Sequence, residues 1–241
     1  MKSNNFKEIY KSVLWDLYNR PDYVVHSSNS QDKERQSGYR ELAGYQFKLT
    51  NIYNNMVDNN ARGFNPTYAR DFFNYVMTGE VGNLASNPRA VEYLAEFEGR
   101  NTQYGPRIRE QLPAMLEELV SDIGTRRAVI LILNADDQEL LTHKSRGKTK
   151  IEYPCTNSLT FSIRDNRLNL VSNMRSQSAA LVMPYDIYNW THLMIEVKDM
   201  LHETYPTLEC GTLTHQIASL HYFNSEEPLV KSILAEYGML V

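Results

Sequence analysis

Cys155 and the polar residues that follow it combine residue types and spacing that could do chemistry. The cysteine stands in Pro154-Cys155-Thr156-Asn157, just before an alternating apolar run that is typical of a strand. The chain turns at 164–166 and returns to Arg175-Ser176, so we expect the thiol and the guanidinium to lie near each other. A thiolate is a strong nucleophile, and a guanidinium binds phosphate well. A lone cysteine is often a buried, inert thiol, but the order Cys155, Arg175-Ser176, Asp186 favours a functional site.

Length and composition narrow the class of protein. The 241 residues contain no linker rich in Gly, Ser or Pro, so the sequence predicts a single domain over 1–241. The net charge of −4 argues against nucleic-acid binding, although a few placed arginines suffice for a small phosphate-bearing ligand. Two cysteines are too few for a disulfide framework, and no apolar run could span a bilayer. We therefore expect a cytoplasmic protein that binds neither membrane nor nucleic acid, and we predict no metal site.

The elements that must position these residues follow from apolar periodicity. Apolar residues three and four apart predict helices near 6–17, 66–78, 88–97, 113–123, 187–204 and from 226 onward. Alternating or continuous apolar runs predict strands near 39–49, 128–133, 159–163, 168–176 and 213–223. The polar segments 20–38 and 143–150 are predicted loops, and Gly44 indicates a bulge or a close approach within its strand. The apolar runs at 128–133 and 159–163 predict buried strands, because they lack the polar alternation of an exposed sheet face.

The motifs Pro154-Cys155-Thr156-Asn157 and Asn173-Met174-Arg175-Ser176 resemble those of the thymidylate synthase and deoxycytidylate hydroxymethylase superfamily. The resemblance covers most of the chain and is most specific from 126 to 221. It implies an α+β fold in which helices flank a large bent mixed β-sheet, and a homodimer that packs sheet face to sheet face. It also implies that Cys155 adds to C6 of a pyrimidine nucleoside monophosphate, which makes C5 nucleophilic. The one-carbon donor of that superfamily is 5,10-methylenetetrahydrofolate.

The resemblance implies roles for further residues. The expected phosphate ligands are the side chains of Arg35, Arg126, Arg127, Arg175 and Ser176. Arg126 and Arg127 would reach the site of the partner subunit. Asp71, in the predicted helix at 66–78, would move protons through water. The remaining expected substrate contacts are Tyr104, Asn157, Asp186 and His221, of which His221 would bind the sugar.

Several of these residues also allow a plainer interpretation. Arg35 is one residue out of register with the superfamily pattern and could be a solvated loop arginine. Asp71 is a methylene shorter than the family's glutamate and could face solvent. Arg126 and Arg127 could be solvated ends of a strand, and Asp186 could cap the helix predicted at 187–204.

Asp186 bears on the choice of base, because the resemblance aligns it with an Asn in the synthases and an Asp in the cytidylate hydroxymethylases. An Asn amide can accept from N3–H of uracil and donate to O4. A carboxylate can accept from N4–H of cytosine and share one proton with N3. The sequence therefore favours a dCMP or CMP 5-hydroxymethylase.

Other positions depart from the superfamily pattern. Ser178 and Val182 replace an Asp and a Gly near the folate, and 106–108 lacks the synthase tryptophans. Phe223 replaces a Tyr that follows the sugar-binding His. Two alternatives thus stay open. One is a thymidylate synthase acting on dUMP, and the other is a nucleotide-binding homologue that uses no folate.

Overall fold

The computed structural model of the chain describes residues 1–26, 37–84, 86, 104–142 and 153–240. In this part of the chain, eight strands belong to one mixed sheet, and helices flank the strands. The predicted α+β fold with a large mixed sheet and flanking helices is therefore confirmed. The chain divides into two compact units. Unit 1 comprises Met1–Phe64, Asn173–Thr191 and Gly211–Val241, and unit 2 comprises Asn65–Ser172 and His192–Cys210. That the whole chain acts as a single domain stays a prediction.

Unit 1 is built on a long antiparallel pair of strands. β3 (Tyr39–Leu49) pairs with β8 (Glu209–Phe223), from Tyr39 opposite Phe223 to Leu49 opposite Leu213. Short parallel pairings add β1 (Lys2–Ser3) to β3 and β7 (Gln177–Ser178) to β8. β2 (Tyr23–Val25) pairs antiparallel with β3. The loop predicted at 20–38 was therefore wrong at 23–25, where pairing with β3 decides the conformation.

Gly44 interrupts β3 without adding a residue to it. Ala43 pairs with Ser219 and Tyr45 with Ile217, so the register is the same on both sides of the glycine. Its φ of 63° is a conformation that residues with a side chain rarely adopt. A Cβ at this position would meet open space. The predicted bulge or close approach was wrong, and the positive φ explains the glycine.

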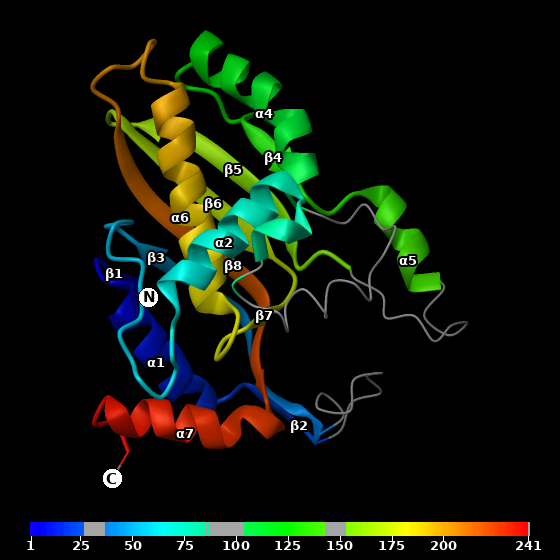
Figure 1. Cartoon of the computed structure of the whole chain (residues 1–241), viewed down its shortest axis with the longest axis vertical. Helices are drawn as coiled ribbons and strands as arrows, with labels where there is room; N and C mark the ends of the chain where they lie inside the picture. Colours follow the sequence, from blue (N-terminus) through cyan, green and yellow to red (C-terminus); the bar gives the residue numbers. More distant parts are fainter. Residues whose placement is uncertain (27–36, 85, 87–103, 143–152, 241) are drawn as a thin grey trace. The chain divides into compact units, whose positions relative to one another are not determined.

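The helices of unit 1 follow their sequence signals. α1 (Phe6–Asn19) begins after Asn5, whose side chain accepts a hydrogen bond from the Lys7 N–H at 2.9 Å. Its buried face is the predicted apolar stripe. α7 (Glu227–Glu236) follows the short 3-10 helix η4 (Asn224–Glu226) and lies beside α1 (Figure 1). α6 (Met183–Met200) begins in unit 1 and continues into unit 2. It starts earlier than predicted, because Pro184 is well suited to the first turn of a helix.

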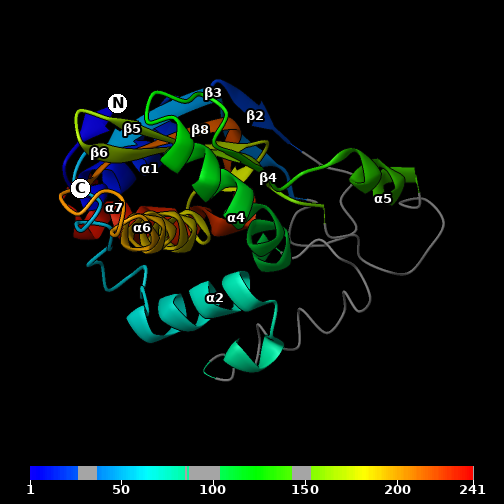
Figure 2. The same cartoon turned by 90° about the horizontal axis from the view of Figure 1, so that it is seen from above.

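Unit 2 contains two helices that pack against each other. α2 (Pro66–Thr78) begins after Asn65 and ends at Gly79, which has a φ of 75°. α4 (Tyr104–Ser121) packs against α2 and against β4 (Val129–Leu131) (Figure 2). α4 is longer than the helix predicted at 113–123, because Pro113 lies inside it instead of starting it. The shorter helices of this unit are η2 (Val81–Leu84), η3 (Ala135–Asp137) and α5 (Gln138–Thr142).

The strands of unit 2 form a hairpin with an added edge strand. β5 (Thr156–Arg164) and β6 (Arg167–Met174) are joined by Asp165 and Asn166, whose φ angles of 51° and 56° suit a two-residue hairpin turn. The turn predicted at 164–166 is confirmed. β4 pairs antiparallel with β5, and Leu131 is 54% exposed. The strand predicted to be buried at 128–133 is therefore an edge strand. The Gln111 amide covers its edge, exchanging hydrogen bonds of 2.8 and 2.9 Å with the Leu131 backbone.

Candidate active site

Asp186, on the first turn of α6, is a buried carboxylate. Its side chain is 6% exposed, and its Oδ2 accepts a hydrogen bond from the Gln177 amide at 2.9 Å. The backbone N–H of Asp186 already donates to the Val182 carbonyl oxygen at 3.1 Å, as a residue inside a helix does. The alternative that Asp186 caps this helix was therefore wrong. Burial raises the pKa of Asp186 to about 7, although the Gln177 hydrogen bond works to lower it.

His215 extends this buried polar chain, which the sequence analysis did not predict. The Gln177 Oε1 lies 3.2 Å from the His215 Nε2, and the imidazole packs against the Phe47 ring with centroids 5.1 Å apart. Burial lowers the pKa of His215 to about 3, so the ring is neutral at physiological pH. The only sequence signal was that His215 shares the inward face of β8 with Leu213 and Ile217.

Unit 1 also contains Arg175 and Ser176, which are predicted to bind the phosphate, and His221, which is predicted to bind the sugar. Arg175 and Ser176 are half-buried and connect β6 to β7. The parallel pairing of β7 with β8 sets Ser178 opposite His221, and the Ala179 N–H donates to the His221 carbonyl oxygen at 2.7 Å. Backbone hydrogen bonds therefore join the segment after Arg175 to β8, the strand that contains His221. The roles of these residues stay predictions.

Cys155 lies in unit 2, half-buried and immediately before β5. The backbone N–H groups of Cys155 and Thr156 both donate to the Tyr104 hydroxyl oxygen, at 3.1 and 3.3 Å. Tyr104 is the first residue of α4, and the next residue must be glycine. A Cβ at Gly105 would overlap the carbonyl oxygen of Val76 and the backbone of Met77. Tyr104 was predicted as a substrate contact, and the structure gives it a positioning contact with the cysteine segment.

Asn157 follows on β5. Its carbonyl oxygen accepts hydrogen bonds from the Ile132 and Leu133 N–H groups at 2.9 and 3.1 Å, which anchors this end of the strand. The Asn157 Oδ1 is buried and has no hydrogen-bond partner within the described residues. An acceptor left in this state is available to a ligand that brings a donor.

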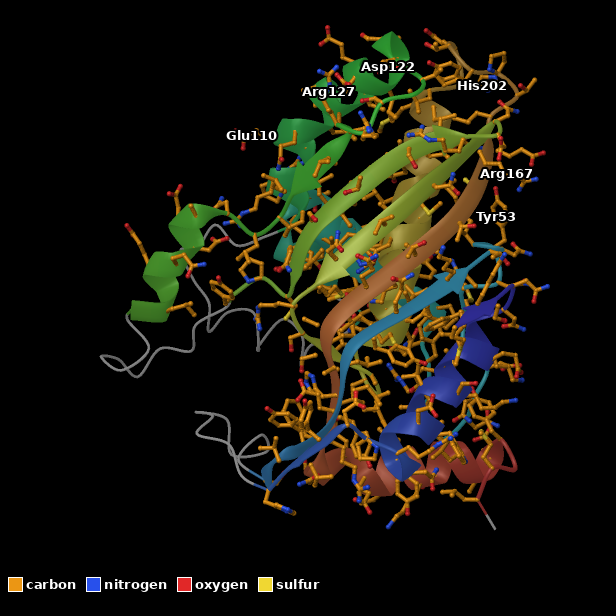
Figure 3. All side chains as sticks on the ribbon, turned by 180° about the vertical axis from the view of Figure 1, so that it is seen from behind. Tyr53, Glu110, Asp122, Arg127, Arg167 and His202 are labelled. Atoms are coloured by element: carbon orange, nitrogen blue, oxygen red, sulfur yellow. The ribbon has the colours of Figure 1, made fainter. Side chains whose placement is uncertain are left out.

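Arg126 and Arg127 are exposed between α4 and β4. The Arg127 Nε donates to the Glu118 Oε1 at 2.9 Å, and the arginine side chain is 78% exposed. Figure 3 labels Arg127 beside the last turns of α4. Both guanidinium groups are thus presented at the surface of unit 2. Their expected reach into a partner subunit stays a prediction.

Asp71 and Arg35 complete the predicted set. Asp71 lies on α2, with its side chain 19% exposed and its Oδ1 3.8 Å from the Arg70 Nε. Its expected part in proton transfer is not tested by this contact. Arg35 lies outside the described residues, as do the helix predicted near 88–97 and the loop predicted at 143–150.

Three residues near the position expected for a folate have side chains that could contact it. The buried Ser178 Oγ has no hydrogen-bond partner within the described part of the chain, so it can serve a ligand. Leu181 and Val182, which follow β7, are 41% and 42% exposed. Arg107 is committed elsewhere, because its guanidinium donates to both Asp137 oxygens at 2.7 Å. A folate could therefore use Ser178, Leu181 and Val182, without Arg107.

No described helix combines the length and apolar character that crossing a membrane requires.

Comparison with known proteins gives the family context. A family model described as thymidylate synthase matches residues 24–237. A protein of Methanococcoides burtonii named "Putative thymidylate synthase" is 24% identical over 230 residues, which cover 92% of this chain and 87% of that protein. A Methanosarcina barkeri protein of the same name is 28% identical over 159 residues, which cover 61% of this chain and 66% of that protein.

Proposed function

Because the chain belongs to the thymidylate synthase family, we propose that it transfers a one-carbon unit to C5 of a pyrimidine nucleotide, and that this nucleotide is dCMP or CMP. The expected product is the 5-hydroxymethyl nucleotide. The observation that carries the choice of base is the buried Asp186 carboxylate, which accepts from the Gln177 amide. The resemblance aligns this position with the residue that reads the pyrimidine edge.

The protonation of Asp186 supports this choice. With a pKa of about 7, both the neutral and the ionised carboxyl are populated near neutral pH. The neutral acid has one donor and one acceptor, which match N3 and N4–H of cytosine. The ionised form would face the O4 lone pairs of uracil with no donor, a buried mismatch that costs about 1–3 kcal/mol. This cost corresponds to a preference for cytosine of about tenfold to a hundredfold.

The chemistry proposed for the other residues follows from their types. Cys155 would form a bond from its sulfur to C6, which raises the electron density at C5. Arg175 and Ser176 would hold the 5′-phosphate and so fix the orientation of the bound nucleotide. Asp71 would accept the C5 proton through water, and loss of Cys155 from C6 would restore the ring. Methylenetetrahydrofolate, which Ser178, Leu181 and Val182 would hold, would supply the one-carbon unit and be released as tetrahydrofolate. Water would then add to the exocyclic methylene at C5 and supply the hydroxyl group of the product.

The direct test is mass spectrometry of the nucleotide after incubation with methylenetetrahydrofolate and dCMP, CMP or dUMP. We expect a hydroxymethylated cytidine nucleotide and little reaction of dUMP. The Cys155→Ala variant is the matched control, because it should make no product yet bind the nucleotide nearly as well as the wild type. Product formation by Cys155→Ala would assign the reaction to another nucleophile.

Thymidylate synthase activity on dUMP is the second candidate, and the names of the two relatives favour it. A methylated product from dUMP, with cytidine nucleotides unreactive, would establish it. A nucleotide-binding homologue would give no product with any of the three. Release of the C5 hydrogen of labelled dCMP without folate separates that case, since it requires addition of Cys155 to C6.

We also propose that the active form is a homodimer in which Arg126 and Arg127 hold the phosphate bound by the partner. Their exposure at the surface of unit 2 supports this arrangement. Arg126→Ala and Cys155→Ala should each be inactive alone. When subunits are mixed, one of the two sites of each heterodimer is intact, so about a quarter of the wild-type activity should return. No recovery despite measured heterodimers would mean that the arginines act within their own chain.

A further inference from the structure

We propose that Gln177, oriented by His215, fixes which oxygen of Asp186 accepts and which donates, and thereby selects cytosine over uracil. This inference rests on the proposed function, because it concerns how that site tells its bases apart. Gln177 and His215 are positioning residues that act on the base through Asp186.

The geometry is a chain of three buried side chains from three elements of unit 1. Gln177 on β7 is 2% exposed, His215 on β8 is fully buried, and Asp186 on α6 is 6% exposed. The amide of Gln177 lies between the other two, with its Nε2 2.9 Å from the Asp186 Oδ2 and its Oε1 3.2 Å from the His215 Nε2. Burial makes each of these polar contacts costly to lose.

The orientation of the Gln177 amide sets the direction of both hydrogen bonds. Its nitrogen faces Asp186 and donates to Oδ2, so its oxygen faces His215. Because that oxygen can only accept, the Nε2 of the neutral His215 ring carries the hydrogen. A proton on Oδ2 would meet this N–H, so the neutral acid holds its proton on Oδ1 instead.

A carboxylic acid with a fixed proton distinguishes two bases that a freely rotating acid would not. When Oδ1 stands opposite N3 and Oδ2 opposite the exocyclic group, the acid donates to N3 and accepts from N4–H of cytosine. Uracil needs the reverse order, with an acceptor facing N3–H and a donor facing O4. The Gln177 hydrogen bond opposes that order, because it keeps the proton away from Oδ2.

Two variants test this assignment. Gln177→Met keeps the length of the side chain and removes both its donor and its acceptor. His215→Phe keeps a ring against Phe47 and removes the N–H that orients the amide. Gln216→Met is the matched control, because the hydrogen bond described for the Gln216 side chain is an exposed one, to the neighbouring Gln46 amide. The quantity to measure is the ratio of kcat/KM for dCMP to that for dUMP.

We expect Gln177→Met to lower this ratio about tenfold and His215→Phe to lower it in the same direction, with Gln216→Met within about twofold of the wild type. A second readout needs no nucleotide. Carbon NMR titration of the Asp186 carboxyl should give a higher pKa in Gln177→Met, because a donor that stabilises the carboxylate is gone.

Different results would contradict the proposed function and the role of Gln177 and His215. A wild-type ratio near one or below would contradict the proposed preference for cytosine, and the inference with it. A wild-type preference for dCMP that both variants retain within about twofold would overturn the inference alone. An unchanged pKa of Asp186 in Gln177→Met would also overturn it, whether or not that variant turns over.

Discussion

Asp137 in unit 2 and Asp186 in unit 1 are two carboxylates of nearly equal burial, 4% and 6% exposed, with different partners. Asp137 accepts from the Arg107 guanidinium through both oxygens at 2.7 Å, and from the Asn134 N–H at 3.0 Å. Asp186 accepts from a neutral amide only, within the contacts described for it. The two carboxylates therefore differ in whether a guanidinium is among their partners.

The pKa values of the two carboxyls move in opposite directions. Burial works to raise the pKa of Asp137, but the hydrogen bonds from Arg107 and from the Asn134 backbone bring it below the ordinary value. Burial raises the pKa of Asp186 to about 7, and the Gln177 hydrogen bond offsets only part of that rise. Asp137, paired with a guanidinium, is thus held as an anion and connects η3 to α4. Asp186, which accepts from an amide, can keep a proton and share it with a nucleotide base.

The largest expected effect comes from removing the counter-ion. Arg107→Met should lower the free energy of unfolding by about 3 kcal/mol at neutral pH, because it leaves the Asp137 charge buried and unpaired. Urea denaturation measures this loss. The double variant Arg107→Met, Asp137→Leu should recover most of it, because no charge then stays behind. A single variant as stable as the wild type would mean that Asp137 does not need its partner, and the comparison would lose its basis.

The second prediction concerns acid stability. Between about pH 4.5 and 6, folding takes up a proton at Asp186, whose folded pKa lies above the ordinary value of about 4. Over the same range folding releases a proton at His215, whose folded pKa of about 3 lies below the ordinary value of about 6.5. The Asp186 contribution is lost as pH rises, the His215 contribution is lost as pH falls, and the two slopes cancel.

Asp186→Asn removes the contribution of Asp186 to the pH dependence of stability and leaves that of His215. Relative to the wild type, the variant should lose about 1.4 kcal/mol of stability for each pH unit of acidification in that window. His215→Phe should show the opposite slope. The measurement is the free energy of unfolding of all three proteins at several pH values, and parallel curves would show that neither group titrates as described.

The third prediction concerns the Tyr104 hydroxyl in unit 2, which we expect to affect turnover more than stability. Tyr104→Phe removes the acceptor shared by the Cys155 and Thr156 N–H groups. We expect kcat to fall about fivefold to tenfold, since the loss of a hydrogen bond of about 1 kcal/mol would let the cysteine segment shift. KM should change little. Steady-state kinetics with Tyr153→Phe as the control would decide, and a loss confined to KM would point to substrate contact.

The sequence predicted the fold where local signals were strong. The helices predicted near 6–17 and 66–78 correspond to α1 and α2, and the turn predicted at 164–166 corresponds to the hairpin at Asp165-Asn166. β2 was missed, because its three residues take their conformation from β3 and not from their own pattern. The exposure of β4 was missed because continuous apolar runs occur at sheet edges as well as in cores.

Individual residues of the candidate site were predicted from the sequence, but the hydrogen bonds between them were not. Asp186 was recognised from a position in a motif. Its link to His215 was not, because it passes through Gln177, which lies 38 residues from His215 in the chain. The segment 106–108 was seen as a departure from the family pattern, but the pairing of Arg107 with Asp137, 30 residues further along the chain, was not predicted. Neither contact has a local sequence signal.

The central claim is that Asp186 chooses the base, and one measurement addresses it directly. The ratio of kcat/KM for dCMP to that for dUMP should be compared between the wild type and Asp186→Asn, with the fold monitored by circular dichroism. We expect the ratio to fall about tenfold or more in the variant, because the Asn amide suits N3–H and O4 of uracil. A ratio within about twofold of the wild-type value would contradict the account, since Asp186 would then have no part in reading the base.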